Sequence, residues 1–144
     1  MKNILSAVIA FSVFVFSGAY AQVAAGLKVD VLKDQKKYAK SDGCYYFPNK
    51  GSEKIVLNDN WCEKGECNGE KAVFNLDGED IVLDNQIGLE KRMGGSSVVG
   101  KYSHKGYSLI LSHAAFDGEK GRANLEIEKD GKTDSISLYM ECID

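Results

Sequence analysis

The sequence predicts a small all-β protein, an eight-stranded antiparallel barrel or a sandwich with two disulfides. Three observations predict this fold. Dipeptides suited to two-residue hairpin turns recur at Asp77-Gly78, Lys105-Gly106 and Asp130-Gly131. The segments flanking each dipeptide alternate apolar and polar side chains, as strands with one buried face do. The chain also contains four cysteines, an even number that suits a disulfide framework in an exported domain.

Residues 1–21 are expected to be a secretory signal peptide and not part of the fold. Lys2 precedes an apolar run from Ile4 to Phe16, and the small residues Ala19 and Ala21, one residue apart, suit cleavage by a signal peptidase after Ala21. A membrane-spanning helix needs about 20 apolar residues, and this run is shorter, so we predict no membrane span. We therefore expect residues 22–144 to fold as a single β domain that is periplasmic or secreted.

Three segments ahead of the first hairpin are candidate strands. They are Leu27–Val31, Tyr45–Phe47 and Lys54–Leu57, and all contain β-branched or aromatic residues. The charged segment Lys33–Lys40 between the first two is expected to be a short helix or a loop. Together with the three hairpins, these segments give nine candidate strands, of which we expect eight to form.

The registers imposed by the three turns can be checked against the side-chain pattern, because opposed residues share a face. Each register gathers most of the large apolar residues on one face, with Val73 and Val82 as exceptions in the first hairpin and Ile110 as the exception in the second. The expected apolar pairs are Ala72 with Leu83, Phe74 with Ile81, Tyr102 with Leu109, Ala123 with Leu138, and Leu125 with Ile136. Short strands with one apolar face each are best accommodated in a closed barrel or in two packed sheets, because these folds remove or cover the exposed strand edges.

The cysteines are expected to form two disulfides. Cys62 and Cys67 enclose a short polar loop containing a glycine, so we favour a Cys62–Cys67 bridge and a long Cys44–Cys142 bridge. The long bridge would close almost the whole domain. A four-cysteine zinc site is the alternative, but the spacing of Cys62 and Cys67 does not suit it. We therefore predict no metal site.

The composition and the motifs argue against several classes of function. The formal net charge is −3, which disfavours a nucleic-acid partner. In the predicted register His104 and His113 lie about 20 Å apart, too far to share a metal ion. Neither a nucleophile elbow nor a zinc-protease motif is present, and turn chemistry explains the acidic tip Asp77–Asp80 without calcium. We expect a protein that is not an enzyme and needs no cofactor.

The layout between Cys44 and Cys142 resembles the periplasmic and membrane-bound inhibitors of C-type lysozyme. The resemblance rests on Cys44-Tyr45-Tyr46, on the hairpin Ala72–Leu83, on Gly100-Lys101-Tyr102 and on Lys120–Leu125. That family forms eight-stranded antiparallel barrels in which an early cysteine is bonded to one near the C-terminus. In it, a Ser-Gly-x-x-Tyr loop and a Lys-Gly-x-x-Ala loop enter the lysozyme cleft, where the serine and the lysine contact the catalytic carboxylates.

The resemblance implies which residues would contact a partner. Lys120 would carry the lysine role, Ser96 or Ser97 the serine role, and Tyr102 the place of the loop tyrosine. Both motifs depart from the family pattern by one residue, since Tyr102 lies one residue closer to its glycine, and so does Ala123.

We therefore expect an exported binding protein that inhibits a lysozyme-like cell-wall hydrolase by inserting loops of the barrel rim into the active-site cleft. The partner would be a protein, bound by a monomer or a homodimer. Two other functions stay open. The chain could be a periplasmic immunity protein that neutralises a secreted toxin, or an envelope or surface structural component.

Overall fold

Nine strands and one short helix make up the described part of the chain. The computed structural model describes residues 26–39, 43–59, 71–88, 97–117 and 119–143. In chain order the elements are β1 (Val29–Asp30), α1 (Gln35–Tyr38), β2 (Gly43–Phe47), β3 (Leu57–Asp59), β4 (Lys71–Leu76), β5 (Glu79–Asp84), β6 (Val98–His104), β7 (Tyr107–Asp117), β8 (Lys120–Lys129) and β9 (Lys132–Ile143). The expected signal peptide, residues 1–21, lies outside the described residues. Among the residues that are described, no helix is long and apolar enough to cross a membrane.

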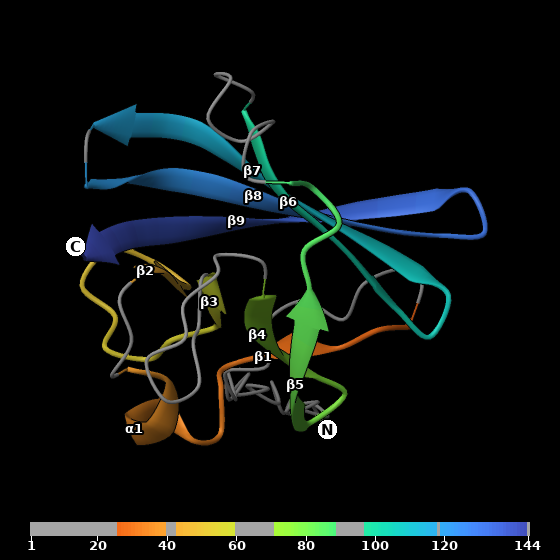
Figure 1. The fold of residues 1–144 in the computed structure, drawn as a ribbon, viewed down its shortest axis with the longest axis horizontal. Coiled ribbons are helices and arrows are strands. Elements are labelled where there is room, and N and C mark those ends of the chain that lie inside the picture. Colours follow the sequence, from red (N-terminus) through yellow and green to blue (C-terminus); the bar gives the residue numbers. More distant parts are fainter. Residues whose placement is uncertain (1–25, 40–42, 60–70, 89–96, 118, 144) are drawn as a thin grey trace, which may run out of the picture.

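All strands belong to one curled antiparallel sheet (Figure 1). Eight of them follow one another in the order β5-β4-β3-β2-β9-β8-β7-β6, and the two-residue β1 pairs with β4 next to β3. The predicted all-β antiparallel fold is therefore confirmed. The sheet is a half-barrel, because β5 and β6, its two end strands, are not joined by a strand ladder within the described segments.

The two end strands nevertheless meet just after β5. The Gln86 N–H donates to the Lys101 carbonyl oxygen at 2.7 Å. The Asn85 side chain donates to the Val99 carbonyl oxygen and accepts from the Lys101 N–H, both at 3.0 Å. The curl thus brings the edge of β6 against the segment that follows β5, which shelters backbone groups that an open edge would expose.

The three predicted hairpins form in the predicted registers. The residues at both turn positions have positive φ, with values of 51° and 83° for Asp77 and Gly78 and 52° and 74° for Asp130 and Gly131. Two successive positive φ values define the hairpin turn whose twist matches that of its strands. The opposed pairs are those expected from the sequence, including Phe74 with Ile81, Tyr102 with Leu109 and Leu125 with Ile136.

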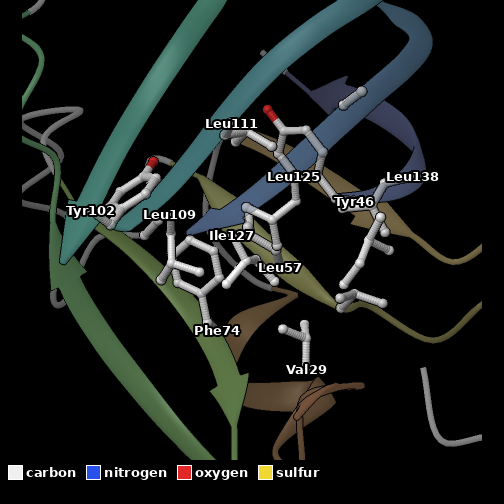
Figure 2. Close-up of a cluster of buried hydrophobic side chains, with 14 of the residues drawn as sticks. Val29, Tyr46, Leu57, Phe74, Tyr102, Leu109, Leu111, Leu125, Ile127 and Leu138 are labelled. Carbon is white, nitrogen blue, oxygen red and sulfur yellow. The ribbon is translucent and has the colours of Figure 1, made fainter. Parts of the chain in front are cut away.

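The concave side of the sheet holds the main core (Figure 2). Alternate residues of every long strand point into it, because the hairpin registers place apolar side chains on one face. Its largest fully buried members are Leu27, Tyr46, Leu57, Phe74, Leu76, Tyr102, Leu109, Leu111, Leu125, Ile127 and Met140. The rings of Phe74 and Tyr102 meet edge to face with centroids 4.9 Å apart, a favourable aromatic geometry.

A smaller core lies on the other side of β2 and β4, under the helix. It is formed by Leu32, Tyr38, Tyr45, Ile55 and Val73. The segment Lys33–Lys40, for which the sequence allows a helix or a loop, contains the four-residue helix α1. Asp34 caps that helix by accepting a hydrogen bond from the Lys37 N–H, as N-cap aspartates do.

One of the two predicted disulfides is present in the described chain. Cys44 and Cys142 are directly opposed on β2 and β9, and their sulfur atoms are bonded. The bridge joins residues 98 positions apart and so ties an early strand to the last one. The other predicted pair, Cys62 and Cys67, lies outside the described residues.

Candidate partner-binding site

A β-bulge shapes the end of the sheet at which β7 meets β8. The β7–β8 register shifts between His113 and Ala115, so one extra residue is inserted in β7. Opposite the bulge, a Cβ atom on Gly121 would overlap the carbonyl oxygen of Ala115. Glycine is therefore required there for the two strands to approach. The bulge turns the end of β7 so that Phe116, which opposes Gly121, follows His113 on the inner face.

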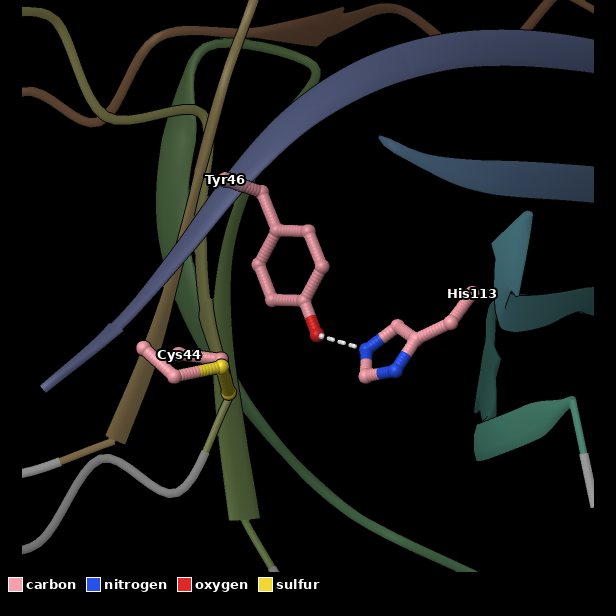
Figure 3. Close-up of a disulfide and its surroundings, with 4 residues drawn as sticks. Cys44, Tyr46 and His113 are labelled. Atoms are coloured by element: carbon pink, nitrogen blue, oxygen red, sulfur yellow. Dashed lines mark hydrogen bonds between the residues drawn. A yellow bond between two sulfur atoms is a disulfide. The ribbon is translucent and has the colours of Figure 1, made fainter. Parts of the chain in front are cut away.

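Three side chains line the inner side of this end of the sheet. They are Tyr46, His113 and Phe116, and we call them the His113 cluster. The Tyr46 hydroxyl lies 3.2 Å from Nε2 of His113, and Cys44 of the disulfide is beside them (Figure 3). The His113 ring stacks on Phe116 with centroids 5.2 Å apart. Burial lowers the pKa of His113 below its usual value, because a charged imidazole would lose hydration there.

A largely apolar pocket of about 530 Å³ lies at the same end of the sheet, around the end of β7 and the start of β8. We call it the β7–β9 pocket. It is lined by Pro48, Asn49 and Lys50, by Ala115, Phe116 and Asp117, by Lys120, Gly121 and Arg122, and by Ser137, Leu138 and Tyr139. Phe116 is 49% exposed, so about half of its side-chain surface is open to a partner.

The charges around this pocket are mostly positive. Lys50, Lys120 and Arg122 line it, against the single carboxylate of Asp117. Lys120 is exposed, and its Nζ lies 3.3 Å from a carboxylate oxygen of Glu141. The hydrogen bond and the charge of Glu141 raise the pKa of Lys120, so this lysine carries its charge throughout the neutral range. Asp117 and Glu141 offset part of the charge of Lys50, Lys120 and Arg122, so the pocket keeps a small positive excess on a chain whose net charge is −3.

The structure brings two of the predicted contact residues to one end of the sheet. Ser97 is exposed, and its carbonyl oxygen accepts a hydrogen bond of 2.7 Å from the His113 N–H of β7. Lys120, the first residue of β8, is directly opposite Asp117, the last residue of β7, in the strand ladder. Ser97 and Lys120 therefore flank the last residues of β7. Ser96 lies outside the described residues.

Tyr102 has a different position from the one that the resemblance implied. Its side chain is fully buried, and its hydroxyl donates to the buried carboxylate of Asp59 at 2.9 Å. Gly100 leaves room for that ring, since a Cβ atom there would overlap it. The Gly-x-Tyr motif thus packs the core, and Tyr102 has no exposed surface to offer a partner.

Sequence reasoning missed Lys50, Phe116 and Tyr139 as members of a surface. Lys50 comes next to this surface only through the pairing of β2 with β9, which joins distant parts of the chain, whereas Tyr139 is opposite Arg122 within the β8–β9 hairpin. A local signal did exist for Phe116. The apolar-polar alternation of β7 is interrupted at Ala114-Ala115, and such an interruption is typical of a bulge that reorients the next side chain.

The two histidines lie at opposite ends of the β6–β7 hairpin. His104 opposes Tyr107 beside the turn, as predicted, while His113 is on the far part of β7. Burial and the charge of Lys105 lower the pKa of His104, while Asp77 and Glu79 act in the opposite direction. In the part of the chain that the structure describes, no three His, Cys, Asp or Glu side chains gather as a metal site would require.

No protein-family model matches this sequence, and no curated protein or solved structure is significantly similar to it. The candidate site is therefore interpreted from its own geometry and charge.

Proposed function

We propose that this protein is an exported inhibitor of a lysozyme-like cell-wall hydrolase, and that it presents the β7–β9 pocket with Lys120 to the enzyme's active-site cleft. The observation that carries the proposal is the exposed Lys120 at the edge of an apolar, basic surface beside Phe116. Glycoside hydrolases of this kind cleave with a pair of carboxylic side chains, so their clefts are acidic where the chemistry occurs. A lysine presented in such a cleft would form an ion pair with these carboxylates.

The contact of Lys120 with Glu141 does not oppose this role. Exposed ion pairs stabilise a folded protein by only about 0–1 kcal/mol, so Lys120 can exchange Glu141 for another carboxylate at small cost. A partner that covers the pocket would exclude water from the new pair and from Phe116. Aromatic and basic side chains in a desolvated centre are the usual strong contributors to protein–protein affinity.

The proposal is tested by measuring lysis of a cell-wall suspension by lysozymes of several classes in the presence of the purified protein. We expect one class to be inhibited, and we expect Lys120→Glu to weaken that inhibition by at least about tenfold, because a buried like-charge contact replaces a favourable one. Lys132→Glu is the matched control, since Lys132 is exposed at the opposite end of β9. Unchanged lysis by every class at a large molar excess would exclude the function.

A further inference from the structure

The exposed ring of the β7–β9 pocket rests on a titratable side chain. Phe116 lines that pocket, and its ring is stacked on the His113 imidazole, with centroids 5.2 Å apart and an interplanar angle of 28°. Both side chains belong to the bulged part of β7. One face of the Phe116 ring is thus held by the imidazole, while about half of the side chain stays open to solvent.

The imidazole is in turn held by a side chain of the main core. The Tyr46 hydroxyl lies 3.2 Å from Nε2 of His113, and Cys44 lies beside them (Figure 3). Tyr46 is fully buried on β2, and the Cys44–Cys142 bridge fixes β2 to β9. Tyr46 therefore cannot follow the imidazole if that ring moves toward solvent. A continuous series of contacts leads from the core through His113 to the ring that lines the pocket.

This series of contacts suits a neutral imidazole better than a charged one. In the neutral ring, Nε2 can accept a hydrogen bond from the Tyr46 hydroxyl while Nδ1 carries the proton. In the imidazolium ion both nitrogens are donors, so the hydroxyl can no longer donate to Nε2. The charged ring also loses hydration in this half-buried place. Protonation therefore favours movement of the imidazole away from Tyr46 and toward water.

No charged side chain among the described residues compensates a proton on His113. The titratable group that faces the imidazole is the Tyr46 hydroxyl of β2. The neighbours that β7, β8 and the segment ahead of β6 contribute carry no charge; they are Phe116, Ala123 and Ser97. The nearby cysteines of β2 and β9 are bonded to each other and do not titrate. Burial alone lowers the pKa of His113 from 6.5, so the neutral form predominates at neutral pH.

We infer that His113 is a positioning residue for Phe116, and that it makes partner binding at the β7–β9 pocket sensitive to acid. Neutral His113 holds the ring where a partner contacts it, and protonated His113 releases the ring. The partner is the lysozyme-like hydrolase of the proposed function, on which this inference rests, whereas the positioning is a property of the free protein.

The direction of the effect follows from burial. A partner that covers Phe116 removes water from the neighbouring imidazole, so the complex tolerates a proton on His113 less well than the free protein does. Because the complex binds this proton less readily, affinity falls as the pH drops below the pKa of His113 in the free protein. A single proton limits the fall to about tenfold per pH unit.

NMR spectroscopy of the free protein, with isotope-labelled phenylalanine and histidine, tests the positioning. We expect nuclear Overhauser contacts between the rings of Phe116 and His113 at neutral pH, and their loss as His113 titrates with a midpoint below 6.5. A change in charge alone would shift the signals but would not remove these contacts. His104→Gln is the matched control, because it removes the histidine at the other end of the β6–β7 hairpin and should leave the loss unchanged.

Affinity measurements test the consequence for a partner. The probe is a C-type lysozyme, or whichever class the lysis assay shows to be inhibited, studied by calorimetry from about pH 7.5 to about pH 5. The enzyme's own carboxylates also respond to pH, so the readout is the affinity of the parent protein divided by that of His113→Gln at each pH. We expect this ratio to fall by at least about threefold over the range, and the ratio taken with His104→Gln to stay constant.

The outcomes distinguish this inference from the proposed function. Rings that stay in contact throughout the pH range in which the protein is folded would overturn the inference, whatever the lysis assay shows. An affinity ratio that does not change with pH for an inhibited hydrolase would also overturn it. Failure of the protein to inhibit any class would exclude the proposed function and the affinity effect, whereas the ring contacts would still decide whether His113 positions Phe116.

Discussion

At the scale of single residues, His113 makes folding stability depend on pH. Its imidazole lies at one end of the main core, beside the Tyr46 hydroxyl and stacked on the Phe116 ring. Burial lowers the pKa of this imidazole from 6.5. The unfolded chain therefore binds this proton more readily than the folded one, and stability rises with pH through that range. The stabilising neutral form is fully present above about pH 6.5 and its contribution is lost as the pH falls toward the lowered value.

The first prediction concerns this dependence. His113→Gln keeps a hydrogen-bonding side chain beside Tyr46 but cannot titrate, so its stability should fall less steeply between about pH 8 and pH 5, the range in which histidine titrates. Urea unfolding at a series of pH values measures the slope. His104→Gln is the companion variant, because the pKa of His104 is also lowered. Superimposable profiles for His113→Gln and the parent protein would contradict the account.

The second prediction concerns Gly121. An added methyl group would overlap the Ala115 carbonyl oxygen, and backbone cannot move aside as a flexible side chain can. We expect Gly121→Ala to lower the free energy of unfolding by about 1–3 kcal/mol, the usual cost of forcing atoms into a filled space. Gly88→Ala is the control, since no atom lies within 4 Å of the place that its methyl group would take, and a change below about 0.5 kcal/mol is expected. Equal unfolding midpoints in urea would refute this role of Gly121.

At the scale of elements, the hairpins were predictable because their information is local. A turn dipeptide fixes the register, and alternation then fixes the buried face, so residues within about ten positions of each turn determine β4–β5, β6–β7 and β8–β9. The pairing of β2 with β9 and the meeting of Asn85–Gln86 with β6 depend on distant segments. No local pattern specifies which distant strands become neighbours, and only the predicted Cys44–Cys142 bridge indicated that β2 lies beside β9.

The same distinction explains which residues of the candidate site the sequence could indicate. Lys120 and Ser97 could be named from short motifs, and both lie beside the end of β7. The resemblance places Tyr102 on the surface, but its register with Leu109 puts it on the buried face, which the alternation already indicated. The pocket itself arises from the bulge and the β2–β9 pairing, so its lining could not be assembled from the sequence.

The third prediction concerns the disulfide between β2 and β9. Because it joins residues 98 positions apart, it removes much of the freedom of the unfolded chain. In the chain-entropy model, a closed loop of about 100 residues gives about 4–5 kcal/mol of stabilisation. Cys44→Ser with Cys142→Ser should lose most of it in urea unfolding, with the β signal of circular dichroism retained under native conditions. A loss below about 1 kcal/mol would show that hydrogen bonding alone holds β2 to β9.

At the scale of the whole molecule, the distribution of charge matters more than its sum. The chain is acidic, with a net charge of −3, yet the β7–β9 pocket bears Lys50, Lys120 and Arg122. Long-range forces follow the net charge, whereas contact forces follow the local surface, since salt screens charges over about 8–10 Å near physiological ionic strength. An acidic molecule with a basic contact surface would be steered toward a basic enzyme and would then bind its acidic cleft.

The fourth prediction separates these two effects kinetically. Lys120→Glu and Lys132→Glu change the net charge equally, so at low salt both should alter the association rate with any hydrolase that the lysis assay shows to be inhibited, and this shared effect should vanish as salt is added. Only Lys120→Glu should accelerate dissociation, by about tenfold or more, because Lys120 lies in the pocket while Lys132 lies at the other end of β9. Surface-based binding kinetics at several salt concentrations measure both rates. If the two variants accelerate dissociation equally, the contact surface must lie elsewhere on the sheet. A lysine held inside the interface would affect dissociation more than a lysine at the other end of β9.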